Sequence, residues 1–188
     1  GILLAVVILD TSSDCNDCND CDNTQADSAP WDSVVTVDTA AVASDVPECS
    51  SIGVQLLKQG GNAVDAAVGV ALCLGVMSPA SSGIGGGCFM NVALVPGAAD
   101  PAADAVHMVI DAREAAPGSA STNMYDGYVD GSLRGGTAAA VPSELAGLHL
   151  AWQKYGALPW DVLVRNMYSF PLNSADIVLG ECILELVS

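Results

Sequence analysis

Residues 42–90 form the stretch that decides the fold, and they read VASDVPECSSIGVQLLKQGGNAVDAAVGVALCLGVMSPASSGIGGGCFM. The first part predicts a helix that is capped at its start by Ser44 or Asp45. That helix is expected to end at Gly60 and Gly61, because glycine adopts the positive φ that a helix terminus often requires. Asn62 then caps a second helix. The segment therefore predicts two consecutive helices joined by a tight turn.

The second helix, residues 63–77, is apolar almost all round, which is typical of a helix buried on every side. A run of glycines at 83–87 follows it and leads into an apolar segment, 88–95, that predicts a strand. Residues 106–113 are expected to pair with it in antiparallel fashion, across a loop rich in Pro, Gly, Ala and Asp. Helices next to such a hairpin indicate a layered α/β (α+β) domain.

The remaining elements are predicted from the glycine, proline and glutamate residues that mark where helices begin and end. Residues 137–141 predict a strand, and the next helix is expected to start at Glu144 and to end before Gly156. Pro159 begins another short helix. We divide the chain into an apolar start with an acidic Cys/Asn/Asp tail at 1–40, expected to be disordered, a domain at 41–164, and a divergent C-terminal tail at 165–188.

The composition excludes several classes of function. The chain has 188 residues, with 22 Asp or Glu against 5 Lys or Arg and a net charge of −17. The electrostatic field of such a negative chain repels nucleic acid and anionic lipid, so we expect no nucleic-acid partner. Half of the residues are apolar, which indicates a folded chain rather than a wholly disordered one.

The chain opens with nine uncharged and mostly aliphatic residues, GILLAVVIL, followed by an acidic tail. They are too few for a membrane-spanning helix, which needs about 20 residues. One interpretation is the end of a signal peptide or signal anchor that lies further upstream. The other is a buried strand or an exposed end. The first interpretation predicts an extracellular or plasma-membrane-associated protein.

Seven cysteines are present, and three of them, Cys15, Cys18 and Cys21, recur every third residue in an Asn/Asp background. The spacing suits thiolate ligands of a metal, but neither a histidine nor a second Cys-x-x-Cys lies nearby, so we predict no metal site. A solvated stalk, with disulfides in an oxidising compartment, is the preferred interpretation. The other four cysteines lie in apolar surroundings and are expected to be small core residues. These are Cys49, Cys73, Cys88 and Cys182.

Arg113 is the candidate binding residue. It stands at the end of a predicted strand between Asp111 and Glu114, in a chain with few basic residues. It could neutralise those carboxylates in a local ion pair, or its planar guanidinium could hold a substrate carboxylate by two hydrogen bonds. The glycine run at 83–87 lacks the pattern of a phosphate-binding loop and precedes a strand, so it predicts a tight turn rather than a nucleotide site. We expect no cofactor.

Four segments in order resemble the large subunit of the gamma-glutamyltransferases, the glutathione hydrolases. They are the 42–68 block, SSGIGGGCFM at 81–90, IDAREAAP at 110–117 and AVPSELAGLHLAWQKYGALPW at 140–160. The resemblance covers about 40–164, toward the N-terminal end of that subunit. It implies the N-terminal nucleophile hydrolase fold, an αββα sandwich that would be incomplete without the small subunit. It also implies that Arg113 holds the α-carboxylate of the γ-glutamyl donor.

In that family a precursor cleaves itself, and the new N-terminal threonine of the small subunit attacks the γ-glutamyl amide of glutathione or a conjugate. The resemblance thus implies cleavage or transfer of a γ-glutamyl group, with a small subunit and a glutathione-like substrate as partners. The threonine is not among these residues, so we assign no catalytic residue and expect the chain to be inactive alone. The alternative is a truncated, non-catalytic protein that acts, if at all, through protein interaction.

Overall fold

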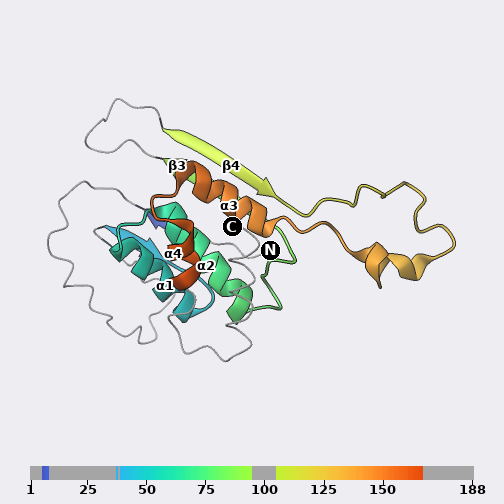
Figure 1. The fold of residues 1–188 in the computed structure, drawn as a ribbon, viewed down its shortest axis with the longest axis horizontal. Coiled ribbons are helices and arrows are strands. Elements are labelled where there is room, and N and C mark those ends of the chain that lie inside the picture. The colour runs from blue at the N-terminus through green and yellow to red at the C-terminus, as the bar shows by residue number, and fades with distance from the viewer. Residues whose placement is uncertain (1–5, 9–36, 38, 95–104, 167–188) are drawn as a thin grey trace, which may run out of the picture.

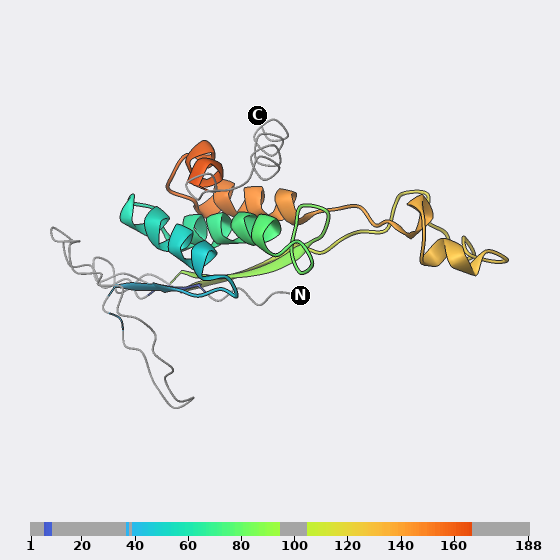
Figure 2. The ribbon, with the colours of Figure 1, turned by 90° about the horizontal axis from the view of Figure 1, so that it is seen from below.

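The computed structural model describes residues 6–8, 37, 39–94 and 105–166. The strands in these ranges are β1 (Val6–Ile8), β2 (Ala40–Val42), β3 (Cys88–Leu94) and β4 (Val106–Ala112). The α-helices are α1 (Pro47–Lys58), α2 (Ala63–Met77), α3 (Glu144–Tyr155) and α4 (Trp160–Asn166), and two short 3₁₀ turns are η1 (Val129–Ser132) and η2 (Gly136–Ala138). Figure 1 shows α2 at the centre of the helices, and Figure 2 shows the helices gathered on one side of the strands. The predicted layered arrangement is confirmed.

The α1–α2 turn has the predicted local chemistry. Gly60 has a φ of 89°, which a residue with a Cβ adopts only with strain. The Asn62 side chain accepts hydrogen bonds from the backbone N–H groups of Val64 and Asp65, while the Asp65 carboxylate accepts one from the Asn62 N–H. This reciprocal pair satisfies donors that a helix start otherwise leaves without partners.

Asp65 is fully buried and also connects α2 to a distant loop. Its carboxylate accepts hydrogen bonds from the N–H groups of Ala157 and Leu158, between α3 and α4. The Asn62 side chain donates to the carbonyl of Tyr155 at the end of α3. Hydrogen bonds from several N–H groups offset much of the desolvation cost of a buried carboxylate. The start of α2 therefore holds the C-terminal helices against the core.

The core lies around α2, whose buried side chains contact α1, α3 and α4. Cys49 of α1 and Cys73 of α2 are both buried, as predicted, but they are joined in a disulfide. The sequence predicted that these two cysteines lie in the core, but it did not predict their pairing. The other buried apolar residues of the core include Ile52, Leu56, Val68, Val70, Leu72, Leu74, Leu148, Ala151, Leu163 and Val164.

The β3–β4 hairpin is antiparallel, with Cys88 opposite Ala112 and Leu94 opposite Val106. Alternate residues face the helices, so Val92 and Ile110 are buried, while Phe89 and Val109 on the opposite face are exposed. Gly147 of α3 lies directly against the Ala112 side chain, so a larger residue there would collide with β4. The absence of a side chain at Gly147 lets α3 approach the end of β4 closely.

Three expectations need correction or limits. The predicted strand at 137–141 is wrong: Gly136–Ala138 forms a 3₁₀ turn, and Val141 makes an isolated bridge with Ala115. The predicted cap of α1 by Ser44 or Asp45 is also wrong. The N-cap residue is Val46, whose side chain makes no capping hydrogen bond, and the Ser44 hydroxyl donates to the Val46 carbonyl.

Within 1–40, Val6–Ile8 pairs with β2 as a strand, so the expected disorder does not extend to these residues. The rest of that segment lies outside the described residues, apart from 37, 39 and 40, and the 165–188 tail does so beyond 166.

Candidate functional site

Arg113 follows the last residue of β4, where the chain leaves the hairpin. Its side chain is 70% exposed, and its Nε lies 3.0 Å from Oε2 of Glu114. The backbone N–H of Arg113 donates to the Asp111 carboxylate at 3.0 Å, which fixes the turn at this point. An ion pair this exposed contributes little to stability. The pair instead limits where the guanidinium can lie, and a guanidinium also has N–H donors on its two Nη atoms.

The glycine run lies directly beneath this pair, as the sequence predicted for a close-approach turn. A Cβ on Gly87 would lie 2.9 Å from Oε2 of Glu114 and would also collide with the Ala112 carbonyl oxygen. The carbonyl of Gly86 accepts hydrogen bonds from the backbone N–H groups of Ser143 and Glu144. The run thus connects the end of β4 to the start of α3.

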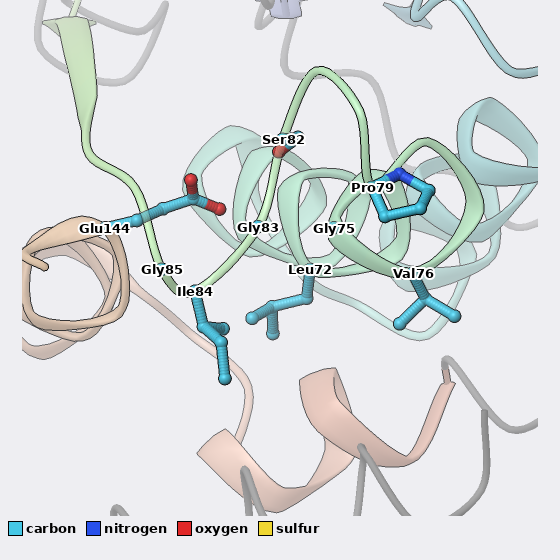
Figure 3. Close-up of a pocket in the computed structure, with 9 residues that line it drawn as sticks. All are labelled: Leu72, Gly75, Val76, Pro79, Ser82, Gly83, Ile84, Gly85 and Glu144. Atoms are coloured by element: carbon cyan, nitrogen blue, oxygen red, sulfur yellow. The ribbon is translucent and has the colours of Figure 1, made fainter. Parts of the chain in front are cut away.

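Glu144 is a buried carboxyl group that the sequence had marked only as a helix start. Burial raises its pKa, and the nearby Glu114 raises it further, while hydrogen bonds from the Gly83 backbone and the Ser82 side chain act in the opposite direction. Figure 3 shows its carboxylate pointing toward Gly83, at one end of a cavity of about 200 Å³. The apolar side chains that line the cavity are Leu72, Val76, Pro79 and Ile84.

Cys88 begins β3 and is half-buried. Burial raises the pKa of its thiol to about 11, and the carboxylates of Glu144 and Glu114 contribute to the increase. Because the thiolate is the reactive form of cysteine, this thiol is a poor nucleophile at neutral pH. The prediction that Cys88 is a packed residue agrees with this environment.

The other chemically capable residues do not gather around Arg113. His149 packs against the rings of Trp152 and Trp160, with centroids 5.1 Å away in each case. Arg165 is paired with Asp161 within α4. Among the described residues, no group of three His, Cys, Asp or Glu side chains could hold a metal ion. The Cys15/Cys18/Cys21 tract lies outside them.

Comparison with known proteins identifies the family. The family model for gamma-glutamyltranspeptidase matches residues 49–170, which include the glycine run, Arg113 and Glu144. The chain belongs to the gamma-glutamyltranspeptidase family. It is 48% identical over 125 residues to glutathione hydrolase 2 of Arabidopsis thaliana and 45% identical over 130 residues to glutathione hydrolase proenzyme 1 of Schizosaccharomyces pombe.

These alignments cover 66% and 69% of the chain but only 20% and 19% of the two relatives. The chain therefore spans about a fifth of the length of the curated gamma-glutamyltranspeptidase relatives it matches.

Solved structures of the family have the same fold. The gamma-glutamyltranspeptidase of Pseudomonas nitroreducens complexed with L-DON matches with a TM-score of 0.62 and 32% identity, over 80% of this chain and 45% of that one. The Helicobacter pylori gamma-glutamyltranspeptidase matches with a TM-score of 0.60 and 32% identity, over 72% and 37%. The described elements are thus part of the N-terminal nucleophile hydrolase fold, as the sequence resemblance implied.

Sequence reasoning singled out Arg113 as a binding residue, which stays a prediction, and expected the tight turn at the glycine run, but it did not mark the burial of Glu144. The sequence placed Glu144 at a helix start, where a glutamate is usually exposed. Its burial depends on the Gly83–Gly86 turn packing over it, however, and a tertiary contact of this kind leaves no local pattern.

Proposed function

We propose that this chain provides the donor-binding part of a gamma-glutamyltransferase large subunit, and that Arg113 holds the α-carboxylate of the γ-glutamyl donor. The observation that carries the proposal is the position of Arg113, which is exposed, restrained by Glu114 and placed at the end of β4. A guanidinium binds a carboxylate through two parallel, charge-assisted hydrogen bonds, and Glu114 contacts Arg113 through Nε.

The reaction that this family resemblance supports is cleavage or transfer of a γ-glutamyl group. The threonine hydroxyl of a small subunit would add to the γ-carbonyl carbon, and the amine of the donor would leave with a proton. Water would release glutamate from the resulting ester, or an amino acid or dipeptide would accept the γ-glutamyl group. Glutathione is the proposed donor, by analogy with the names of the relatives.

Arg113 alone cannot perform this chemistry, so the activity is proposed to require the small subunit. Cys88 lies near Glu114 and Glu144, but its raised pKa disfavours the thiolate that an attack would need. We expect the 188-residue chain alone to release no chromogenic amine from a γ-glutamyl anilide. Measurable turnover by the purified chain would contradict this expectation.

The compartment is also a proposal. The buried Cys49–Cys73 disulfide supports an oxidising environment, because cytosolic thiols are generally kept reduced. None of the described helices is long and apolar enough to cross a membrane. We propose an extracellular or plasma-membrane-associated location. Mass spectrometry after alkylation of the native protein should recover Cys49 and Cys73 in one cross-linked peptide. Two separately alkylated peptides would count against the disulfide, and so against an oxidising compartment.

A chimera tests the proposed activity. Residues 40–166 would replace the matching segment in the precursor of glutathione hydrolase 2 of Arabidopsis thaliana, to which this chain is 48% identical. We expect the chimera to mature and to release p-nitroaniline from γ-glutamyl-p-nitroanilide. A chimera that folds and matures but has no activity would favour the alternative, a non-catalytic protein that acts through protein interaction.

A further inference from the structure

The peptide group that precedes Arg113 is held at both of its polar ends. Its carbonyl belongs to Ala112 and accepts a hydrogen bond of 2.7 Å from the Ser143 hydroxyl. Its N–H belongs to Arg113 and donates to the Asp111 carboxylate at 3.0 Å. A peptide group is planar, so hydrogen bonds at its two opposite ends restrict the rotation of the whole plane. They therefore restrict the direction in which the Arg113 side chain leaves the backbone.

Ser143 occupies the N-cap position of α3, where a serine side chain ordinarily accepts a hydrogen bond from the first turn of the helix. Its side chain makes no capping hydrogen bond to α3. The hydroxyl donates instead to Ala112, which lies 31 residues earlier in the chain. A local contact that stabilises a helix start is thus replaced by a distant one that reaches the residue before Arg113.

Val141 and Ser143 contact the chain on both sides of Arg113. Val141 exchanges backbone hydrogen bonds of 3.3 and 2.9 Å with Ala115, two residues after Arg113. The Ser143 hydroxyl contacts the residue directly before Arg113. The position of Ser143 is fixed in turn, because its backbone N–H donates to the carbonyl of Gly86 at 2.9 Å. The start of α3 therefore supports the end of β4 from which the Arg113 side chain projects.

We propose that Ser143 is a positioning residue for the donor site, and that its hydroxyl keeps Arg113 in the orientation that binds the donor α-carboxylate. The inference rests on the proposed function, because the orientation of Arg113 matters to KM only where Arg113 binds the donor. The ion pair with Glu114 restrains the guanidinium, whereas Ser143 restrains the backbone at the root of the same side chain. A side chain that is ordered before binding loses less conformational entropy when the ligand arrives, and this strengthens binding.

The first test is Ser143→Ala in the chimera, with KM and kcat measured for the γ-glutamyl anilide. We expect KM to rise about fivefold, the factor that corresponds to the net contribution of one hydrogen bond, with kcat changed by less than about twofold. Ser143→Thr keeps a hydroxyl, so its KM should stay within about twofold of the parent. An unchanged KM in Ser143→Ala would overturn the positioning role, and so would a KM in Ser143→Thr as high as that in Ser143→Ala.

Ser44→Ala is the matched control. Ser44 is half-buried like Ser143, also precedes a helix, and donates through its hydroxyl to the Val46 carbonyl at 2.8 Å. Its KM should stay within about twofold of the parent, because this hydroxyl does not contact the chain beside Arg113. A rise equal to that in Ser143→Ala would show that the loss of any such hydroxyl weakens donor binding, which contradicts a specific role for Ser143.

A double-mutant cycle with Arg113→Ala separates positioning from a general structural effect. If Ser143 acts through Arg113, then Ser143→Ala should change KM by less than about twofold in the Arg113→Ala background. If Ser143 only supports the fold, the rise in KM should persist in that background, and the proposal is overturned. Maturation of each variant is followed by the appearance of two subunits on a denaturing gel. Failure of Ser143→Ala to mature, while Ser44→Ala matures, would assign Ser143 a folding role and overturn the proposal too.

Activity of the parent chimera separates the two proposals. An inactive parent that has matured counts against the proposed function and against the positioning role that rests on it. An active parent whose KM does not respond to Ser143→Ala overturns the positioning role alone.

Discussion

Arg113 and Glu114 show how neighbouring residues acquire different roles at the end of one strand. Arg113 is exposed and Glu114 is partly buried against the glycine run, so Glu114 serves as a fixed support for the guanidinium. Gly86 and Gly87 have no Cβ, and this leaves space for the Glu114 carboxylate beside the turn. The same space brings Glu114 close to Cys88 and Glu144, whose pKa values it raises.

Cys88 provides a test of this electrostatic environment. With its pKa raised from 9.0 to about 11, the thiolate fraction at pH 8 is about 100-fold lower than for an unperturbed thiol. A thiolate of higher pKa is also more nucleophilic, so alkylation of Cys88 by iodoacetamide, followed by peptide mass spectrometry, should be about tenfold slower than alkylation of a free thiol. Glu144→Gln should speed the reaction, because it removes one of the two carboxylates. A rate at pH 8 equal to that of free cysteine would disprove the assigned environment.

The raised pKa of Glu144 predicts how the free energy of unfolding changes with pH. A carboxyl group whose pKa is higher in the folded chain binds its proton more tightly there than in the unfolded chain. The protonated carboxyl group therefore contributes its full stabilisation at pH values below its pKa in the unfolded chain, which is about 4.3. This contribution is lost as the pH rises through the pKa of the group in the folded chain. In urea unfolding, Glu144→Gln should gain stability relative to wild type between pH 4 and pH 7.

The control for this experiment is Glu48→Gln, an exposed charge in the first turn of α1. Removing it takes away a favourable interaction with the helix dipole, so it should not reproduce the gain. If the difference between Glu144→Gln and wild type stays constant or falls from pH 4 to pH 7, the raised pKa is wrong.

At the scale of elements, the α1–α2 pair is joined by a covalent bond that crosses the core. The Cys49–Cys73 disulfide closes a loop across a sequence separation of 24 residues. Loop-closure entropy assigns such a link about 3–4 kcal/mol. The double variant Cys49→Ala/Cys73→Ala should lose roughly that much free energy of unfolding in urea.

Cys88→Ala is the matched control for the disulfide, since it removes a cysteine without removing a cross-link. It should lose clearly less stability than the double variant. Coincident urea midpoints for wild type and the double variant would show that the bond does not form.

The elements that the sequence predicted correctly are those with local signals. Gly60 and Asn62 mark the end of one helix and the start of the next through backbone conformation and capping, which depend on a few adjacent residues. The β3–β4 hairpin followed from two apolar runs with a loop between them. In contrast, the strand expected near Thr137 lacked a partner strand along its length, and only Val141 found one.

In the candidate site, too, local sequence signals indicate some features, while others depend on tertiary packing. Arg113 was proposed as a binding residue because arginine is rare in this chain and because the surrounding motif resembles a known family. The cavity beside Glu144 and the Cys49–Cys73 bond could not be predicted, since each joins residues that are distant in sequence. Their geometry depends on how α1, α2 and α3 pack, and periodicity does not specify that packing.

At the scale of the whole molecule, the described part exposes large apolar side chains outside its core. Phe89 and Val109 on the outer face of the hairpin are exposed, and so are Tyr128, Val129 and Leu133 in or next to η1. Exposed apolar side chains that cluster on a surface are typical of contact sites.

The central claim is that Arg113 binds the donor carboxylate, and KM for the γ-glutamyl anilide in the chimera tests it most directly. Arg113→Ala should raise KM about 10- to 100-fold, as expected for the loss of a charge-assisted pair, with a smaller effect on kcat. Arg165→Ala is the matched control: its side chain is equally 70% exposed and likewise pairs through Nε with one carboxylate. Its KM should stay within twofold of the parent. An Arg113→Ala chimera with the KM of the parent would contradict the account.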